Sequence, residues 1–512
     1  MLLRTSLALV AGLTLSLAFE PVALPLVMPF AVAAFFVSTR GLRARSAWIP
    51  GLAFGVAFYF THISWMRDSI GPDAWVALAT IESLFYAALG SVTAALHRRR
   101  LWALWMAPAW VTMEVVRSGW PFSGMPWGRL AFGVVDTPVA PALPYVGSVG
   151  VSLLLALVSS LLAWAVVARG RERRVAGGAT LAALALTLLP ALTPYDVEET
   201  GQATVAAVQG NLPGPADNIL FDSQQVTDNH VQATIDLADE IAAGTRPEVD
   251  FVLWPENSTA SDPFGDAEVN AGIRAASAAI GVPILVGAIV DAGPEHVLNQ
   301  GIVWDPVTGA GERYTKRHPV PYGEYIPLRE YLDGTFGKLA LIPRDMLSGS
   351  RKTPLEIAGI SVADAICFDI AYDDGLYDQV SRGAELLTVQ TSNASFIFTD
   401  QIDQQFAMTR LRAVEAGRWL VVASPNGISG VVSPDGEVVA TADPRTQAVL
   451  VETVGLSSEI TLAVRLGPWV GRSSAVLTGV GLLLGLLAYR RSRHSPAPGG
   501  APDETPEDEV LP

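Results

Sequence analysis

Three short stretches of this sequence carry side chains that could take part in one catalytic site. The stretch FVLWPEN ends an apolar run just before Glu256, and AICFDIAYDD ends another at Cys367. The polar stretch RYTKRHPVPYGEYIP holds Lys316 and Glu324. In open α/β sheets, sites form outside the carboxyl ends of the strands, so side chains that follow separate strands can converge there.

A glutamate, a lysine and a cysteine suffice for acyl transfer without a histidine or a metal ion. A thiol attacks a carbonyl as its thiolate, and a free cysteine is mostly protonated at neutral pH. A neighbouring carboxylate can take the proton, and a neighbouring ammonium can stabilise the thiolate and then the tetrahedral oxyanion. Glu256, Lys316 and Cys367 are therefore candidates for this chemistry.

Each of these residues has a plainer interpretation when it is taken alone. A single cysteine at the end of an apolar strand is most often a core residue, a glutamate after Trp-Pro a surface turn residue, and a lysine in a polar loop a solvated one. Their occurrence together in three specific motifs favours the catalytic interpretation. With one cysteine and six scattered histidines, we expect no metal site and no cofactor.

The elements that must position these residues divide into apolar and ordinary sequence. Half of the chain is hydrophobic and only 16% is charged, against about 25% charged in a typical soluble domain. The first two hundred residues are almost entirely apolar, which predicts a membrane protein with a soluble domain attached. The net charge of −16 argues against nucleic-acid binding, which needs a basic surface.

Eight stretches are candidate membrane spans, because each is close to the length of apolar helix that crosses a bilayer. They lie near 2–19, 21–38, 47–66, 74–96, 101–117, 147–168, 175–193 and 473–489.

Four clusters of arginine alternate with loops that carry almost no basic residues. The clusters lie within 40–45, 98–100, 169–174 and 490–493. Since basic loops belong in the cytoplasm, both termini are expected there. An odd number of spans before the soluble segment then places residues 195–460 on the opposite, extracytoplasmic side.

The middle segment alternates apolar β-branched runs with amphipathic helical stretches. Strands are predicted at 203–208, 250–254, 283–290, 361–367, 385–390 and 418–424, with further strands in 426–455, and helices at 226–243, 266–280 and 402–417. This alternation predicts an α/β layered domain whose sheet is covered on both faces.

Four units follow from these patterns. Residues 1–194 are a membrane domain of about seven helices, and 195–460 are the catalytic domain. Residues 461–493 hold the final span with its flanks. Residues 494–512 are rich in Pro, Gly, Asp and Glu, which predicts a disordered cytoplasmic tail.

The three motifs resemble those of the carbon–nitrogen hydrolase (nitrilase) superfamily, whose triad is Glu, Lys and Cys in that chain order. A nitrilase-like domain inserted before the last of about eight spans is similar to the bacterial apolipoprotein N-acyltransferase family. The stretches KRHPVPYGEYIP and FSGMPWGRL (122–130) resemble motifs of that family. The resemblance implies an α-β-β-α nitrilase-like domain on the outer side of the bacterial cytoplasmic (inner) membrane.

Several positions depart from the family pattern. Pro319 stands where the family usually has Leu, and Tyr322 where it has Phe. Asp369 replaces a glutamate near the nucleophile, and we count it among the supporting residues. The largest departure is TSNASFIFTD (391–400), where the family reads close to S-N-D-A-W-F-G. This segment is expected to alter the acyl pocket or its lid, and to leave the triad intact.

The resemblance implies a two-step transfer. Cys367 attacks an acyl ester of a membrane phospholipid and forms a thioester, and the α-amine of a diacylglyceryl-cysteine at a lipoprotein N-terminus then takes the acyl chain. Glu256 is the implied general base. Lys316 and the backbone N–H of Phe368 are the implied oxyanion donors, and Glu324 has a supporting role.

Two loops are expected to lead acyl chains from the bilayer to Cys367. These loops span 118–146 and 325–350. The second contains a cluster of apolar side chains that we expect to face the membrane: Tyr331, Phe336, Leu339, Leu341 and Ile342.

Two other classes of function remain open at this point. A membrane-tethered amidase would use water in place of the amine, but one anchor would serve it, whereas this chain has about eight spans. A transporter or scaffold would carry charged pairs inside its spans, and we expect none. The main acidic residues within spans, Glu82 and Glu114, are expected near the membrane interfaces.

Overall fold

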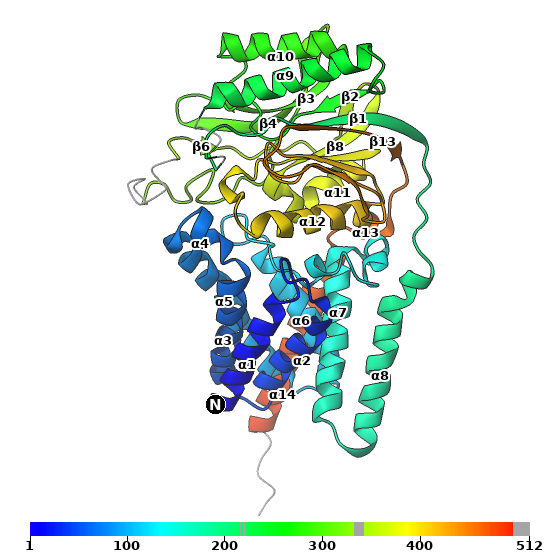
Figure 1. The fold of residues 1–512 in the computed structure, drawn as a ribbon. Coiled ribbons are helices and arrows are strands. Elements are labelled where there is room, and N and C mark those ends of the chain that lie inside the picture. Colours follow the sequence, from blue (N-terminus) through cyan, green and yellow to red (C-terminus); the bar gives the residue numbers. More distant parts are fainter. Residues whose placement is uncertain (216, 219–221, 332–341, 495–512) are drawn as a thin grey trace, which may run out of the picture.

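The computed structural model describes residues 1–215, 217–218, 222–331 and 342–494. Its helical bundle is built from the first 192 residues and from 469–494, and a two-sheet α/β domain lies on one end of that bundle (Figure 1). The N-terminus and the connection between α7 and α8 lie at the other end (Figure 1).

Each of the eight predicted spans coincides with one helix of the bundle. Their bounds are α1 (Leu2–Ser16), α2 (Met28–Thr39), α3 (Ala44–His62), α5 (Pro72–Leu96), α6 (Trp102–Arg117), α7 (Leu143–Val167), α8 (Gly170–Leu188) and α14 (Trp469–His494). A short helix, α4 (Trp65–Ser69), lies beneath the α/β domain (Figure 1).

Length and composition single out some of these helices. Among the described residues, four helical stretches are long and apolar enough to cross a membrane: Pro72–Leu96, Ala140–Val167, Gly170–Leu192 and Trp469–Ala488. The first two predicted spans become shorter apolar helices, because prolines at 21 and 25 interrupt the chain between them.

A buried charged pair within the bundle corrects one expectation. Glu82 is 1% exposed in the middle of α5, and its Oε2 lies 3.4 Å from Nη1 of the fully buried Arg117. Glu114 is also buried and accepts hydrogen bonds from the Trp110 indole and from the backbone N–H of Leu130. The prediction that the spans lack buried charged pairs was therefore wrong. A pattern of apolar residues does not reveal a partner that lies 35 residues away.

The α/β domain contains two stacked sheets. In the described residues the first has the order β13-β1-β2-β3-β4-β5 with β6 beside β4, and the second has the order β12-β11-β10-β9-β8-β7. The bounds are β1 (Gly201–Gln209), β2 (Phe251–Leu253), β3 (Ile284–Asp291), β4 (His296–Asp305), β5 (Gly309–Thr315), β6 (Asp345–Met346), β7 (Leu355–Ile357), β8 (Ile360–Ile366), β9 (Leu386–Gln390), β10 (Leu420–Ala423), β11 (Gly430–Val432), β12 (Val438–Thr441) and β13 (Ala448–Leu456).

Helices cover the outer face of each sheet. The amphipathic helices α9 (Ser223–Ala242) and α10 (Ala267–Ile280) pack on the first sheet, and α11 (Asp374–Val380), α12 (Gln401–Ala416) and α13 (Leu462–Leu466) pack on the second (Figure 1). A third apolar cluster fills the space between the sheets. The predicted layered architecture is confirmed, with two sheets between the helical layers.

Most predicted strands and all three predicted helices of this domain occur within a few residues of their expected bounds. The strands β4, β5 and β7 were not predicted. Glycine and polar side chains interrupt their apolar pattern, as in HVLNQGIVWD and GAGERYT. Their pairing with β3, with each other and with β8 provides what the local pattern lacks.

The hydrophobic core of the bundle continues into the α/β domain. Phe368 and Tyr372, which follow β8, belong to the same apolar cluster as the bundle helices, and so do Met408, Leu411 and Val414 of α12. One face of α12 thus packs on the bundle. The bundle therefore supports the end of the second sheet directly.

Two sequence predictions concern residues outside the described part of the chain. The acidic tail lies almost entirely in 495–512, and Phe336, Leu339 and Leu341 lie in 332–341. Of the remaining members of that apolar cluster, Tyr331 is 81% exposed, whereas Ile342 is buried.

Candidate active site

The ends of three strands bring the predicted residues together. Glu256 follows β2, Lys316 follows β5 directly, and Cys367 follows β8 directly. The first two strands belong to one sheet and β8 to the other, so the site lies where the ends of the stacked sheets meet. Cys367 lies close enough to Glu256, Lys316 and Glu324 for their charges to shift the pKa of its thiol.

Lys316 is the central cation of the site. Its side chain is fully buried, with Nζ 3.0 Å from Oε1 of Glu256 and 2.6 Å from Oε1 of Glu324. Burial disfavours the ammonium, but the charges of the two carboxylates outweigh burial and raise the pKa of Lys316 well above its usual value. Lys316 is therefore a fixed positive charge at neutral pH.

Glu256 is held by donors on three sides. Its Oε1 accepts from Asn299 Nδ2 at 2.7 Å as well as from Lys316, and its Oε2 accepts from the backbone N–H of Ser392 at 2.8 Å. The carboxylate is 2% exposed. A carboxylate oxygen can accept more than one hydrogen bond, so Oε2 still has room for the proton of a thiol.

Glu324 completes the ion cluster. Its Oε2 accepts the backbone N–H of Val320 at 2.8 Å, which folds the loop after Lys316 back onto the site. Burial raises the pKa of Glu324, while the positive charge of Lys316 opposes that rise. Glu324, for which the sequence predicted a supporting role, thus forms a direct ion pair with Lys316.

Cys367 occupies a sharp turn between β8 and the short 3-10 helix Cys367–Ala371. Its φ angle is +51°, which is uncommon for a residue with a side chain and turns the thiol out of the strand. The residue is partly exposed. A similar strained turn between strand and helix presents the nucleophile in other hydrolytic folds.

The thiol is neutral in the resting site. Burial raises the pKa of Cys367 to about 12, the charge of Glu256 adds to the rise, and the charge of Lys316 opposes it. Since a neutral thiol is a poor nucleophile, a reaction at this sulfur would require the proton to leave. A carboxylate within the same buried cluster can receive it.

Asp369 connects the loop that begins at Lys316 to the turn that holds Cys367. Its carboxylate accepts the backbone N–H groups of Arg317 at 3.1 Å and His318 at 2.7 Å, and the Tyr314 hydroxyl at 2.9 Å. These groups flank Lys316 on both sides. Asp369 therefore positions Lys316 relative to Cys367, and the shorter side chain noted in the sequence still spans this gap.

The loop that resembles a family motif, 122–130, docks on the residues after the nucleophile. Trp127 stacks on Phe368 with ring centroids 6.0 Å apart, and the Tyr372 hydroxyl donates to the backbone oxygens of Ser123 and Gly124. Phe368, whose backbone N–H is predicted as an oxyanion donor, thus packs against the bundle and against Trp127 of this loop.

The atypical segment 391–400 also lies at the site. Ser392 donates to Glu256, Asn393 adopts a φ of +52°, and a 3-10 turn follows at Ala394–Phe396. Phe396 packs edge-on against Trp65 of α4, with ring centroids 5.5 Å apart. The segment therefore connects the site to the bundle.

Sequence reasoning missed that Asn299 and Ser392 donate hydrogen bonds to Glu256. Asn299 lies in a strand that was not predicted, and the signal that could have identified it is a pair of amide side chains, Asn-Gln, inside an apolar run. The backbone donor of Ser392 leaves no such signal, because every residue type except proline has that N–H group.

Comparison with known proteins bears on the whole chain. Residues 11–161 match the model of the apolipoprotein N-acyltransferase N-terminal domain, and 204–462 match that of the carbon–nitrogen hydrolases. An apolipoprotein N-acyltransferase of Mycolicibacterium smegmatis is 34% identical over 506 residues, which cover 94% of this chain and 84% of that protein. The chain belongs to the apolipoprotein N-acyltransferase family.

Other members of the apolipoprotein N-acyltransferase family align over a similar length. The Pseudomonas putida protein is 28% identical over 514 residues, covering 94% of this chain and 97% of that protein. A solved amidase from Nesterenkonia sp. covers 52% of this chain at 17% identity, with a TM-score of 0.36. The alignments with apolipoprotein N-acyltransferases confirm the family resemblance inferred from the sequence motifs along nearly the full chain.

Proposed function

We propose that this chain transfers an acyl chain from a membrane phospholipid to the N-terminal amine of diacylglyceryl-modified lipoproteins, through a thioester on Cys367. Membership of the apolipoprotein N-acyltransferase family supports the reaction class and the lipoprotein acceptor. The phospholipid donor, the thioester and the residue roles are proposed from the chemistry of the site.

In the first step Glu256 takes the proton of Cys367 as the sulfur attacks the ester carbonyl. Lys316 and the backbone N–H of Phe368 stabilise the oxyanion. The ester C–O bond breaks, and the departing lysophospholipid oxygen takes the proton from Glu256. In the second step the lipoprotein amine attacks the thioester, the C–S bond breaks, and the amine proton returns to sulfur through Glu256.

One observation favours a lipid donor over a soluble amide. The residues immediately after the nucleophile, Phe368 and Tyr372, pack in the hydrophobic core of the bundle. A thiol at this position lies beside the end of the bundle, where an ester between acyl chain and head group would be found. A soluble amidase has no need of this placement.

The arrangement of the basic loops supports an extracytoplasmic site. Arg4 contacts the backbone of Ser38 and Arg40, and Arg40 lies 6.0 Å from the Trp102 ring, so three of the chain's connections meet at one end. The α/β domain lies at the opposite end (Figure 1). With basic loops in the cytoplasm, eight spans cross the inner membrane, both termini are cytoplasmic, and residues 195–460 form the outer domain.

Mass spectrometry of the intact protein tests the chemistry. After incubation with phospholipid, the wild type should gain the mass of one acyl chain at Cys367, and an amine-bearing lipopeptide should remove it. Release by water at the same rate would identify an amidase. No mass gain under conditions where the protein remains folded would contradict the thioester proposal.

Two conservative variants test the nucleophile and the base. Cys367→Ser should form neither acyl-enzyme nor product, and Glu256→Gln should acylate at least a hundred-fold more slowly, because general-base catalysis contributes about 10²–10⁴-fold. Glu268→Gln, in the first turn of α10, is a matched control that should behave as wild type. Near-wild-type turnover of a well-folded Glu256→Gln variant would remove Glu256 from the mechanism.

A pair of reporter fusions tests the topology. A reporter placed after Pro194 should be extracytoplasmic, and one placed after Arg493 cytoplasmic. If both lie on the same side, the odd number of spans before the α/β domain is incorrect.

A further inference from the structure

Thr391 lies next to the nucleophile on the neighbouring strand. β8 and β9 are parallel, with Ile366 opposite Gln390, so the next residues along the two strands are Cys367 and Thr391. Thr391 is 3% exposed, and its hydroxyl is within hydrogen-bonding reach of the thiol. The first residue of the atypical segment 391–400 therefore contacts the reacting sulfur.

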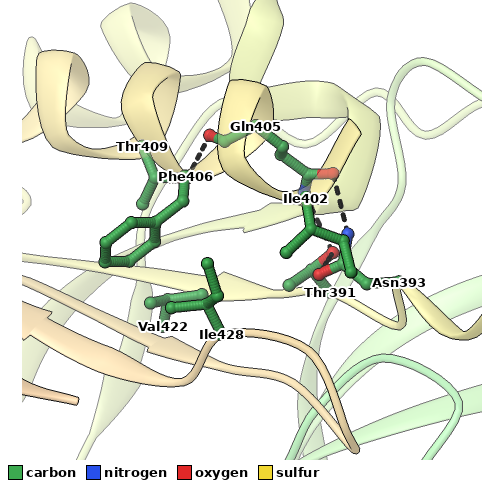
Figure 2. A pocket seen from close by; sticks show the side chains of 8 residues that line it. All are labelled: Thr391, Asn393, Ile402, Gln405, Phe406, Thr409, Val422 and Ile428. Carbon is green, nitrogen blue, oxygen red and sulfur yellow. Dashed lines mark hydrogen bonds between the residues drawn. The ribbon is translucent and has the colours of Figure 1, made fainter. Parts of the chain in front are cut away.

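Two amide side chains hold the Thr391 hydroxyl in place. Gln405 Nε2 donates to Thr391 Oγ1 at 2.9 Å, and Thr391 Oγ1 donates to Asn393 Oδ1 at 3.2 Å (Figure 2). Gln405 Oε1 in turn accepts from Asn393 Nδ2 at 3.1 Å and from Gln401 Nε2 at 2.7 Å. This arrangement fixes the hydroxyl oxygen and leaves only the direction of its proton to vary.

The surroundings of this network favour a fixed structure over a ligand site. Thr391, Asn393 and Gln405 line a cavity of only about 10 Å³ between α12 and the second sheet, together with apolar residues such as Ile402 and Phe406 (Figure 2). A cavity of this size holds one water molecule at most. The three polar side chains are therefore arranged around one another.

The proton of the Thr391 hydroxyl has two acceptors, Asn393 Oδ1 and the sulfur of Cys367. The 3.2 Å bond to Asn393 is at the long end of the range for a hydroxyl donor. A negatively charged acceptor forms a stronger hydrogen bond than a neutral amide oxygen does. The hydroxyl will therefore point to sulfur whenever sulfur carries negative charge.

We propose that Thr391 is a further catalytic residue, which donates a hydrogen bond to the sulfur of Cys367 while that sulfur is a thiolate. The inference rests on the proposed thioester chemistry. Thr391 transfers no proton: in the acylation step the thiol proton goes to Glu256 as the S–C bond forms and the ester C–O bond breaks. In the second step the N–C bond forms and the S–C bond breaks, and Thr391 stabilises the departing thiolate until Glu256 returns a proton.

The contact also accounts for how a buried thiol can ionise at all. Burial and the charge of Glu256 raise the pKa of Cys367, whereas Lys316 and the Thr391 hydroxyl both lower it. Lys316 is already engaged by two carboxylates, Glu256 and Glu324. A second, uncharged donor at the sulfur adds stabilisation without another buried charge.

Alkylation of the single cysteine by iodoacetamide tests the proposal independently of lipid chemistry. In full-length detergent-solubilised protein between pH 7 and 10, Thr391→Val should be alkylated at least about ten-fold more slowly, since a hydrogen bond to a charged group contributes about 1.5–3 kcal/mol. Thr391→Ser keeps the hydroxyl and should remain within about two-fold of wild type. Thr409→Val is the matched control, because Thr409 lines the same cavity but donates to the backbone oxygen of Gln405 (Figure 2).

The outcomes separate this inference from the proposed function. Equal alkylation of folded Thr391→Val and wild type over the whole pH range would overturn it, even if both form the acyl-enzyme. If wild type forms no acyl-enzyme, the thioester proposal fails, and the alkylation series still decides the contact between Thr391 and sulfur. Thr391→Ala provides a second hydroxyl-free variant if the valine lowers the thermal unfolding midpoint.

Discussion

The indole N–H of Trp127 donates a 2.7 Å hydrogen bond to the side-chain oxygen of Gln404, although the two residues are 277 positions apart. The same oxygen accepts the indole N–H of Trp65 at 3.0 Å, and the amide nitrogen of Gln404 donates to the backbone oxygens of Glu20 and His62. One glutamine of α12 thus binds three separate segments of the bundle. Because Trp127 also stacks on Phe368, this contact links the bundle to the nucleophile turn.

Gln404→Leu should therefore lower both stability and acylation rate. The leucine leaves two buried indole N–H groups unpaired, and each unpaired buried donor costs about 1–3 kcal/mol. Loss of the Trp127 anchor should also slow acyl-enzyme formation, measured by mass spectrometry. The exposed Gln232 on α9 is the control, and Gln232→Leu should change neither quantity. If Gln404→Leu lowers the unfolding midpoint but acylates at the wild-type rate, the glutamine has only a structural role.

Lys316→Met should slow acyl-enzyme formation by two to three orders of magnitude, by analogy with removing one oxyanion donor, at about 3–4 kcal/mol. In the structure it leaves Glu256 and Glu324 buried without their cation, and breaking a buried ion pair costs about 3–5 kcal/mol. Lys352→Met, at an exposed ion pair, is the matched control.

The sign of the pH dependence of Lys316→Met follows from the unpaired Glu324 carboxyl. Burial raises the pKa of Glu324 and the charge of Lys316 opposes that rise, so without the cation this pKa lies further above its value in the unfolded chain. Stability is then retained in acid and lost as pH increases. Thermal unfolding at pH 5 and pH 8 should therefore show a larger deficit at pH 8. A deficit that is equal at both pH values would show that the Glu324 carboxyl is not the cause.

Glu324→Gln should change alkylation and acylation in opposite directions. The charge of Glu324 raises the pKa of Cys367, so its removal should lower that pKa and speed reaction with iodoacetamide at any pH below it. Acylation should fall about ten-fold, because the amide cannot accept from both Lys316 and Val320 as the carboxylate does. The exposed Glu330→Gln in the same loop is the control. A parallel fall in both rates would indicate local unfolding instead.

Asp364→Asn should preserve the fold and flatten its pH dependence. Oδ2 of Asp364 and Oε1 of Gln390 are buried acceptors without a donor among the described residues, and both point at Gly301. Burial raises the pKa of Asp364 well above its usual value, so the carboxyl keeps a proton that it can share with Gln390.

The sign for Asp364 can be tested by thermal unfolding. A folded pKa above the unfolded value means that stability is complete at acid pH and declines as pH rises toward the folded pKa. Wild type should therefore lose stability between pH 5 and pH 9 more steeply than Asp364→Asn, whose amide donates to Gln390 at every pH. Equal slopes would show that Asp364 is ionised in the native state. Gly301→Ala should destabilise both proteins, because its Cβ would clash with the two oxygens.

Much of the fold was predictable because its signals are local. Apolar length marked the eight bundle helices, and β-branched runs marked β1, β2, β3, β8, β9 and β10. The strands β4 and β5 were not predicted, since GIVWD and GAGERYT acquire their strand geometry from neighbours on the sheet. The Glu82–Arg117 pair was not predicted either, because each residue lies in its own apolar helix and only the packing of these helices brings the two side chains together.

The sequence alone determined which residue types are available for the chemistry. A single cysteine, a glutamate after Trp-Pro and a lysine before Arg-His marked Cys367, Glu256 and Lys316 as candidate catalytic residues, because the residues around each form a short local motif. The tertiary structure decided which hydrogen-bond and ion-pair partners surround these side chains. Asn299 and Ser392 on Glu256, Glu324 on Lys316, and Thr391 beside Cys367 were fixed by strand register and by the stacking of two sheets. Register sets which side chains meet across a sheet, and it depends on pairing energies summed over whole strands, so no single motif records it.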